Sequence, residues 1–277
     1  TLWHTLSLHD ALPISLFDRN ILSFEFIIAG VVLGALLGAV AAKKVKMTAM
    51  PEMVAVFNGF GGGASALVAW GEFTRLETGS LEIQALITTG LSILIGSITF
   101  TGSFIAFGKL KGFIGGGRIA LPGQNIINLL LTAAALGLVG WFTIDPEYQV
   151  VFWSLFGLAL LIGVLTVLPI GGADMPVVIS LLNSYSGIAA SMAGFVLGNN
   201  LLIISGALVG AAGLILTNIM CQAMNRTLFN VLFGAFGGEE AGPGQDLGDK
   251  SVQQTFADDV AIQCAYANKV VVVPGYG

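Results

Sequence analysis

Charged residues are scarce in this chain: of its 277 residues, 10% are Asp, Glu, Lys or Arg, whereas 55% are hydrophobic. So low a charge content excludes an ordinary soluble domain and is typical of a protein that crosses a membrane several times. The chain has no basic patch with interleaved aromatic residues, which argues against nucleic acid as a partner. Its two cysteines, Cys221 and Cys264, lack the spacing of a metal site or a disulfide framework, so we expect neither.

Histidine is nearly absent, and its two copies, His4 and His9, lie close to the start of the chain. Histidine is the side chain that ordinarily titrates near neutral pH. A proton pathway through the apolar part of this chain therefore needs a carboxylate, ordered water or an ionisable group from a partner chain.

Residues 1–20 match none of the patterns that follow them. They begin without Met and have neither the basic start nor the cleavage site of a signal peptide. We interpret residues 1–15 as foreign sequence from a cloning or assembly junction; the alternative is a short extramembrane tail.

About seven apolar stretches are long enough to cross a hydrocarbon core of about 30 Å at ~1.5 Å per residue. They are Leu22–Ala42, Met53–Trp70, Ile83–Phe107, Ile126–Phe142, Val150–Leu168, Met175–Leu197 and Leu201–Met220. Residues 21–226 are therefore expected to form an all-α polytopic membrane helix bundle. The second and sixth stretches carry glycines and polar residues that suit helices buried in protein, so we expect both in the bundle interior.

Basic residues alternate from loop to loop. Those that follow the first, third and seventh stretches are Lys43, Lys44, Lys46, Lys109, Lys111, Arg118 and Arg226. The opposite loops are acidic, with Arg75 as their one base. The positive-inside rule thus predicts that the lysine loops and the C-terminal segment are cytoplasmic.

The composition changes after the last apolar stretch. Residues 227–269 are rich in Gly, acidic and polar residues and predict a linker with a short helix. Val270–Val273 is a β-branched run typical of a buried parallel strand, and it leads into Gly275, Tyr276 and Gly277. Such a Gly-x-Gly turn lets the backbone approach a pyrophosphate, so residues 270–277 predict the truncated start of a Rossmann-like α/β domain; the alternative is an unrelated glycine turn.

Two charged residues stand at the cytoplasmic ends of the predicted helices. Asp174 precedes Met175 and Pro176 and suits a helix N-cap; otherwise it gates proton entry or contacts a cytoplasmic domain. Arg226 is either a positive-inside anchor or part of the joint where the chain leaves the membrane.

Polar residues inside a membrane helix are candidates for function. Asn183 and Ser186 lie on one helix face, with Ser180 a turn earlier, and this stripe is either helix-packing glue or the wall of a hydrated path. Asn58 lies about two turns into the second stretch. Its amide can relay hydrogen bonds through water but cannot carry a proton near pH 7.

Six long or unusual motifs follow one another between Val31 and Gly277. They are Ala42–Ala55, Thr99–Leu110, Gly171–Val178, Leu182–Gly187, Met220–Arg226 and Val273–Gly277. In sequence and in order these motifs resemble the β subunit of proton-translocating NAD(P) transhydrogenases.

The resemblance implies a Re/Si-type membrane enzyme that transfers a hydride from NADH to NADP⁺ while protons move inward across the bacterial inner membrane. This chain would supply the proton-conducting membrane domain in the lipid bilayer. An NADP(H)-binding domain would follow at the C-terminus, a partner α subunit would bind NAD(H), and the complex would be a dimer of α–β units.

The resemblance also assigns residues to the proton path. Asn58 falls where family members have His or Asn, and Asn183 falls at a second polar position. Asp174 falls at the cytoplasmic mouth, and Ser103 is a further candidate on the same path.

Two departures from the family pattern concern the ends of the chain. Gly275 and Gly277 match the first two glycines of the family's NADP pyrophosphate loop, with Tyr276 between them, but the rest of that domain is not in the sequence. The family also has about two further spans before Val31. We therefore expect the chain as written to bind no nucleotide tightly and to catalyse no hydride transfer.

Two other functions fit part of the pattern. A secondary transporter of a small solute also uses glycine-broken helices and polar residues near the bilayer midplane, but it predicts an internal repeat that this sequence lacks. A non-catalytic membrane anchor does not require the polar stripe. Neither function explains the Gly-x-Gly turn at the end of the chain.

Overall fold

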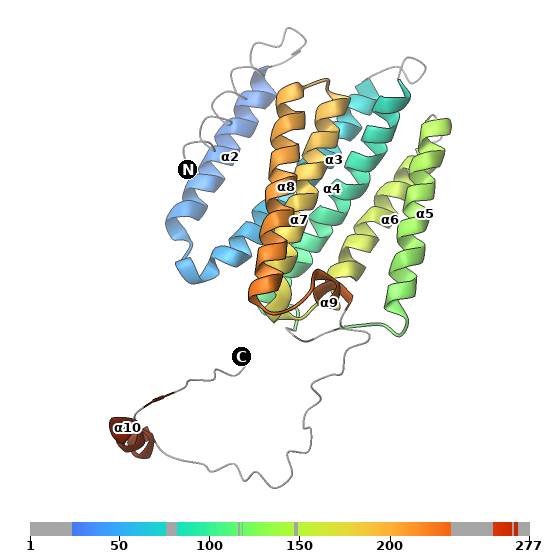
Figure 1. Cartoon of the computed structure of the whole chain (residues 1–277). Helices are drawn as coiled ribbons and strands as arrows, with labels where there is room; N and C mark the ends of the chain where they lie inside the picture. The colour runs from blue at the N-terminus through green and yellow to red at the C-terminus, as the bar shows by residue number, and fades with distance from the viewer. Residues whose placement is uncertain are drawn as a thin grey trace. The chain divides into compact units, whose positions relative to one another are not determined.

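The computed structural model describes residues 24–75, 82–115, 117, 119–146, 149–233, 257–267 and 269–270. Within these ranges all regular structure is helical. The helices are α2 (Phe24–Lys44), η1 (Met47–Ala49), α3 (Met50–Arg75), α4 (Ile83–Leu110), α5 (Gln124–Ile144), α6 (Gln149–Val167), η3 (Gly172–Asp174), α7 (Met175–Val196), α8 (Asn200–Ala223), α9 (Leu228–Phe233) and α10 (Ala257–Tyr266). Figure 1 shows α3 to α8 side by side in one bundle.

Residues 237–277 form a unit of their own, of which α10 is the described helix. The short helix predicted between residues 227 and 269 is thus present at Ala257–Tyr266. The predicted strand Val270–Val273 and the turn at Gly275, Tyr276 and Gly277 lie outside the described residues, apart from Val270.

Six helices in the described ranges are long and apolar enough to cross a membrane, namely α3 to α8 with the adjoining η1 and η3 residues. The sequence predicts seven such stretches. The first of them falls on α2, whose described apolar part, Ile27–Ala41, is shorter than the other six. The membrane helix bundle is confirmed, with six spans that meet the length and composition of a crossing helix.

Burial separates inner helices from outer ones. In the apolar window of α7, 67% of the residues are buried, and in that of α4 56%, compared with 17% in α5 and 22% in α8. The predicted interior position of the sixth stretch is confirmed, because that stretch is α7. The same prediction for the second stretch is wrong, because α3 is only 33% buried and α4 takes the interior position.

Small residues explain why α4 rather than α3 is the more buried of the two helices. Helix α4 contacts α3, α5, α6 and α7, and most of its buried positions are Gly, Ser or Thr. Helix α3 uses its glycines on one face: a Cβ atom on Gly62 would lie 2.7 Å from the Cβ atom of Thr99 in α4. Phe57 and Phe60 of α3 are 48% and 56% exposed, and the Phe60 ring also packs edge-to-face against Phe104 of α4. The glycine run therefore brings α3 close to α4.

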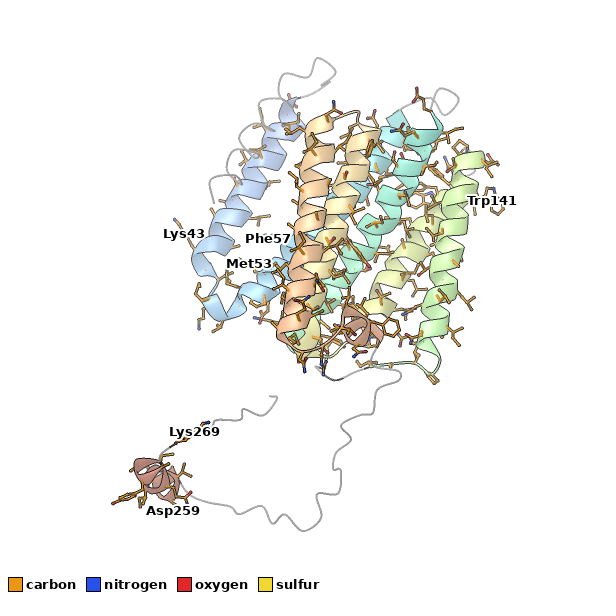
Figure 2. The ribbon with its side chains drawn as sticks, viewed as in Figure 1. Lys43, Met53, Phe57, Trp141, Asp259 and Lys269 are labelled. Atoms are coloured by element: carbon orange, nitrogen blue, oxygen red, sulfur yellow. The ribbon has the colours of Figure 1, made fainter. Side chains whose placement is uncertain are left out.

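Glycines also bring α7 and α8 into close contact. A Cβ atom on Gly206 would lie 2.5 Å from the backbone nitrogen of Ser191, and one on Gly213 would lie 2.7 Å from that of Ser184. In contrast, large apolar side chains on α5 and α8 face away from their neighbours; Trp141, for example, is 53% exposed and projects outward from α5 (Figure 2). Close contact inside and an apolar exterior are what a lipid environment requires.

The ends of the helices that carry basic residues meet at one end of the bundle. Lys111, just after α4, lies 3.1 Å from Glu52 in the first turn of α3. Arg226, just after α8, lies 3.0 Å from Asp174, which directly precedes α7. Alternate loops thus share one side, as the sequence predicts. Arg118, which belongs to the same set of basic residues, lies outside the described residues.

Candidate functional site

Three neighbouring helices meet at a hydrogen-bonded group of polar side chains, which we call the polar junction: Asn58 of α3, Ser103 of α4 and Ser186 of α7. The amide nitrogen of Asn58 donates to Ser103 Oγ at 3.0 Å. The hydroxyl of Ser186 donates to Asn58 Oδ1 at 2.7 Å. One asparagine thereby connects two hydroxyl groups on two different helices.

The polar junction lies well inside the bundle. Asn58 is 9% exposed and Ser103 is fully buried, while Ser186 is partly buried. Asn58 is eight residues after the start of α3, and Ser103 is seven residues before the end of α4. At ~1.5 Å per residue, both lie roughly 10 to 12 Å from the end that carries the basic residues, about a third of the way across a ~30 Å core.

Asn183 takes part in the polar junction through its backbone. The hydroxyl of Ser186 also lies 2.8 Å from the Asn183 carbonyl oxygen. The Asn183 side chain is half-buried and makes no hydrogen bond to another residue in the described part of the chain. The structure therefore brings Asn58 and Ser103 together, as the resemblance implies, and puts Ser186 rather than the Asn183 amide in contact with them.

The polar stripe of α7 divides between two faces. Ser180 donates to the Gly213 carbonyl at 3.2 Å and Ser184 donates to the Gly210 carbonyl at 2.7 Å, both in α8. Ser186, in contrast, turns toward α3. Ser180, together with Ser184 outside the predicted stripe, therefore holds α7 to α8, while Ser186 belongs to the polar junction.

Sequence reasoning missed a second contact between the same three helices. The hydroxyl of Ser92 in α4 lies 3.1 Å from the Ser65 carbonyl of α3 and 3.1 Å from the Ala189 carbonyl of α7. Ser92 and Ser103 are eleven residues apart, which is close to three full helical turns, with Gly96 and Thr99 between them on the same face. The helical spacing of these small residues along α4 is the signal that would have identified this polar face.

Asp174 does not act as the side-chain helix cap that the sequence allows. Its carboxylate makes no capping hydrogen bond to α7. Instead, Arg226 Nη1 donates to both Asp174 Oδ1 and Oδ2 at 3.0 Å. Burial explains the choice, because the Asp174 side chain is only 6% exposed and a buried carboxylate needs a charged partner more than a backbone donor.

The end of α8 places Arg226 beside Asp174. Asn225 has a positive φ of 53°, and the Arg226 amide donates to the Cys221 carbonyl at 2.9 Å. A left-handed residue just past a helix end reverses the chain, and Asn tolerates that conformation better than most residues. The reversal turns Arg226 back toward the start of α7, so that its position is set by the backbone as well as by its charge.

The polar junction carries no group that titrates near neutral pH. Its amide and hydroxyl groups can accept and donate hydrogen bonds in series, which permits a proton relay with water but not storage of the proton. Among the described residues, the one buried carboxylate is that of Asp174, at the basic end of the bundle. The candidate nucleotide contacts Gly275, Tyr276 and Gly277 lie outside the described residues.

Comparison with known proteins gives one family. A family model described as NAD(P) transhydrogenase beta subunit matches residues 4–277. The chain is 44% identical over 275 residues to the NAD(P) transhydrogenase subunit beta of Rhodospirillum rubrum, and the match covers 96% of this chain. The same subunit from a named strain of that species gives the same values. The chain spans 59% of the length of these relatives.

Proposed function

The chain belongs to the NAD(P) transhydrogenase beta subunit family, and on that basis we propose that it forms the proton-conducting membrane domain of a proton-translocating NAD(P) transhydrogenase. The complete Re/Si-type enzyme would transfer a hydride from NADH to NADP⁺ while protons cross the membrane. The polar junction is the observation that carries this proposal, because it is a continuous set of hydrogen-bonding side chains in the interior of an apolar bundle.

The polar junction supplies relay groups rather than a proton acceptor. Ser186 donates to Asn58, and Asn58 donates to Ser103, so the three groups form one directional chain of donors and acceptors. Each hydroxyl can reverse its direction by rotation, whereas the amide cannot exchange its two ends without a flip of its plane. A proton that passes this point therefore travels with water, and the group that holds it lies elsewhere in the path or on a partner chain.

In this proposal Asp174 controls the basic end of that path. It is buried, it precedes α7, and α7 carries Ser186 about three turns further on. The Arg226 guanidinium pairs with that carboxylate and belongs to the segment between α8 and α9, and α9 packs against the bundle through the buried Val231. Any movement of that segment would act on the Asp174 carboxylate directly.

Coupling needs two access states whose populations a ligand shifts. We place the hinge at Met220–Arg226, where the chain leaves α8 toward residues 237–277. The redox state of NADP(H), which supplies or accepts the hydride, would change the position of its domain and hence the environment of Arg226. A change at that one side chain would open or close the mouth at Asp174.

Family membership supports a proposal for the remaining components of the complex. NADP(H) would be held by a domain that begins near Gly275, Tyr276 and Gly277, and NAD(H) by an α subunit. The complex would be a dimer of α–β units in the bacterial inner membrane. The basic loops and the C-terminal segment would face the cytoplasm, since lysines and arginines gather at that end.

The test replaces the two asparagines that the resemblance assigns to the path by an apolar side chain of similar size, in the complete enzyme reconstituted in vesicles with a pH-sensitive dye inside. Asn58→Leu and Asn183→Leu should lower proton-coupled turnover more than they lower NADP(H) binding. Asn218→Leu is the matched control, because Asn218 lies exposed on α8, outside the polar junction. Its coupled rate should stay at the wild-type value.

Unchanged coupled rates in both Asn58→Leu and Asn183→Leu would contradict the proposed path. Loss of proton movement with full hydride transfer would instead support it, since the two processes would then be separated at the polar junction. A wild-type complex that moves a solute but no hydride would favour the secondary transporter, and one that moves neither would favour the anchor.

A further inference from the structure

Lys109 is a buried cation whose partners are all backbone carbonyl groups. It lies in the last turn of α4 and is 3% exposed. Its Nζ atom donates to the carbonyl oxygens of Gly117, Leu168 and Ile170, the last at 2.6 Å. No carboxylate in the described ranges lies within ion-pair distance of it.

The positive-inside rule accounts for Lys111 but not for Lys109. The Lys111 side chain is 47% exposed and pairs with Glu52 at the surface, as expected for a lysine at the membrane boundary. Lys109 lies two residues earlier, in the last turn of α4, yet its side chain is buried in the bundle. Burial of a charge without a counter-ion is costly, so a folded protein keeps one only where its environment stabilises the charge.

The end of α6 provides that stabilisation. Helix α6 ends at Val167, and Leu168 and Ile170 flank Pro169 just beyond it. The last carbonyl groups of a helix lack partners within the helix and carry the negative end of its dipole, which favours a cation. An ammonium group has three donors, and here each donor has one carbonyl acceptor.

The turn held by Lys109 leads directly to Asp174. From Ile170 the chain passes through η3, which ends at Asp174, and α7 begins at the next residue. Lys109 therefore ties the end of α4 to the segment that sets where the Asp174 carboxylate lies. Helix α4 also carries Ser103, less than two turns before Lys109, so one rigid helix joins the polar junction to the base of the ionic pair.

We propose that Lys109 is a positioning residue for the Asp174–Arg226 pair: through the carbonyl groups of Leu168 and Ile170 it fixes the α6–α7 turn, and so the carboxylate at the mouth of the path. The consequence for proton movement rests on the function proposed above. The positional part does not, and can be measured without turnover.

The first experiment measures the turn itself. A spin label on Ala173→Cys, an exposed position next to Asp174, reports the mobility of the turn in the complete protein with Cys264→Ser in the background. Lys109→Met should make this label more mobile, and Lys109→Arg, which keeps donors and charge, should restore the wild-type spectrum. Lys111→Met is the matched control and should leave it unchanged. A second label on Ile144→Cys, the last residue of α5 at the end of the bundle away from Asp174, checks that the bundle remains folded.

The second experiment links the turn to activity. Lys109→Met should lower the proton-coupled rate on the order of tenfold, as small displacements of a reacting group do. If Lys109 acts through the ionic pair, Lys109→Met combined with Arg226→Lys should lower the rate less than the product of the two single effects. Independent effects that multiply would overturn the proposal.

The outcomes separate the two proposals. An Ala173 label that keeps its wild-type mobility in Lys109→Met overturns the positioning role, whatever the rates. If Lys109→Met does not assemble, Lys109→Gln, which keeps donors without the charge, provides the same measurement. A wild-type complex without proton-coupled turnover would contradict the proposed function, while the label would still test Lys109.

Discussion

Arg226 Nη1 lies 3.0 Å from both carboxylate oxygens of Asp174, although 52 residues separate the two in the sequence. The pair joins the segment after α8 to the start of α7, at the end of the bundle that carries the basic residues. Its two members differ in burial, since the Asp174 side chain is 6% exposed and that of Arg226 is 44% exposed. That difference makes the two single substitutions unequal.

Arg226→Met should destabilise the folded bundle more than Asp174→Asn does. Without Arg226 a buried carboxylate loses its partner, at a cost of about 1–3 kcal/mol, whereas without Asp174 a half-exposed guanidinium turns to solvent at a cost of less than about 1 kcal/mol. Thermal unfolding in detergent measures both. Lys111→Met, which breaks the exposed pair with Glu52, is the control and should change the midpoint little; equal losses for the first two variants would contradict the argument.

Gly206→Ala should destabilise the contact between α7 and α8. The new methyl group would lie 2.5 Å from the Ser191 nitrogen and 2.7 Å from the Gly187 carbonyl, so the helices must separate, at a cost of about 1–3 kcal/mol. Gly34→Ala is the matched control, because its methyl group meets no atom within 4 Å. It should leave stability unchanged or raise it by up to about 1 kcal/mol through helix propensity. Equal unfolding midpoints for both variants would show that the close contact does not limit stability.

The sequence predicts which segments form the helices of the bundle better than it predicts which helices pack against one another. Apolar length and the alternation of basic loops give the helices and the shared end of Lys111 and Arg226, because both follow from the cost of placing polar groups in lipid. They do not tell α3 from α4 as the inner helix. A run such as Gly59–Gly63 shows that a close contact exists, but the number of such faces on a helix decides its burial, and α4 has small residues on several.

The candidate site shows the same limit at the level of single side chains. The sequence and the resemblance identify Asn58 and Ser103, and the structure joins them. They do not assign Ser186 to α3 and Ser180 to α8, because six residues make about 1.7 helical turns and so put the two side chains on different faces of α7. Lys109 is the largest departure: its position suits a surface anchor, and only the fold shows that its ammonium group donates to the carbonyl groups of Gly117, Leu168 and Ile170.

Ser186→Ala and Ser180→Ala should differ in their effect on coupling, although both residues lie on α7. Ser186→Ala removes the donor to Asn58 Oδ1 and should lower the proton-coupled rate, with a stability loss of about 0.5–1.5 kcal/mol. Ser180→Ala removes the donor to the Gly213 carbonyl and should cost a similar amount of stability without loss of coupling. Coupled rates in vesicles and unfolding midpoints are measured on both. A lower coupled rate in Ser180→Ala alone would place the path on the α8 side of α7.

Single cysteines at Met47 and Ile144 should react with a membrane-impermeant thiol reagent from opposite sides of the membrane. Both side chains are 85% exposed, so access rather than burial decides their labelling. Met47 begins η1 between α2 and α3, beside Lys46, and Ile144 ends α5 at the far end of the bundle. The positive-inside rule predicts that Ile144→Cys is labelled in intact cells, and Met47→Cys only after the inner membrane is opened.

Cys264→Ser removes the exposed native thiol, and the buried Cys221 is retained as an internal control that should stay unlabelled in both conditions. The reverse pattern would put Asp174 and Arg226 on the outer side, where a cytoplasmic nucleotide domain could not act on them, and would remove the mechanical basis of the proposed coupling.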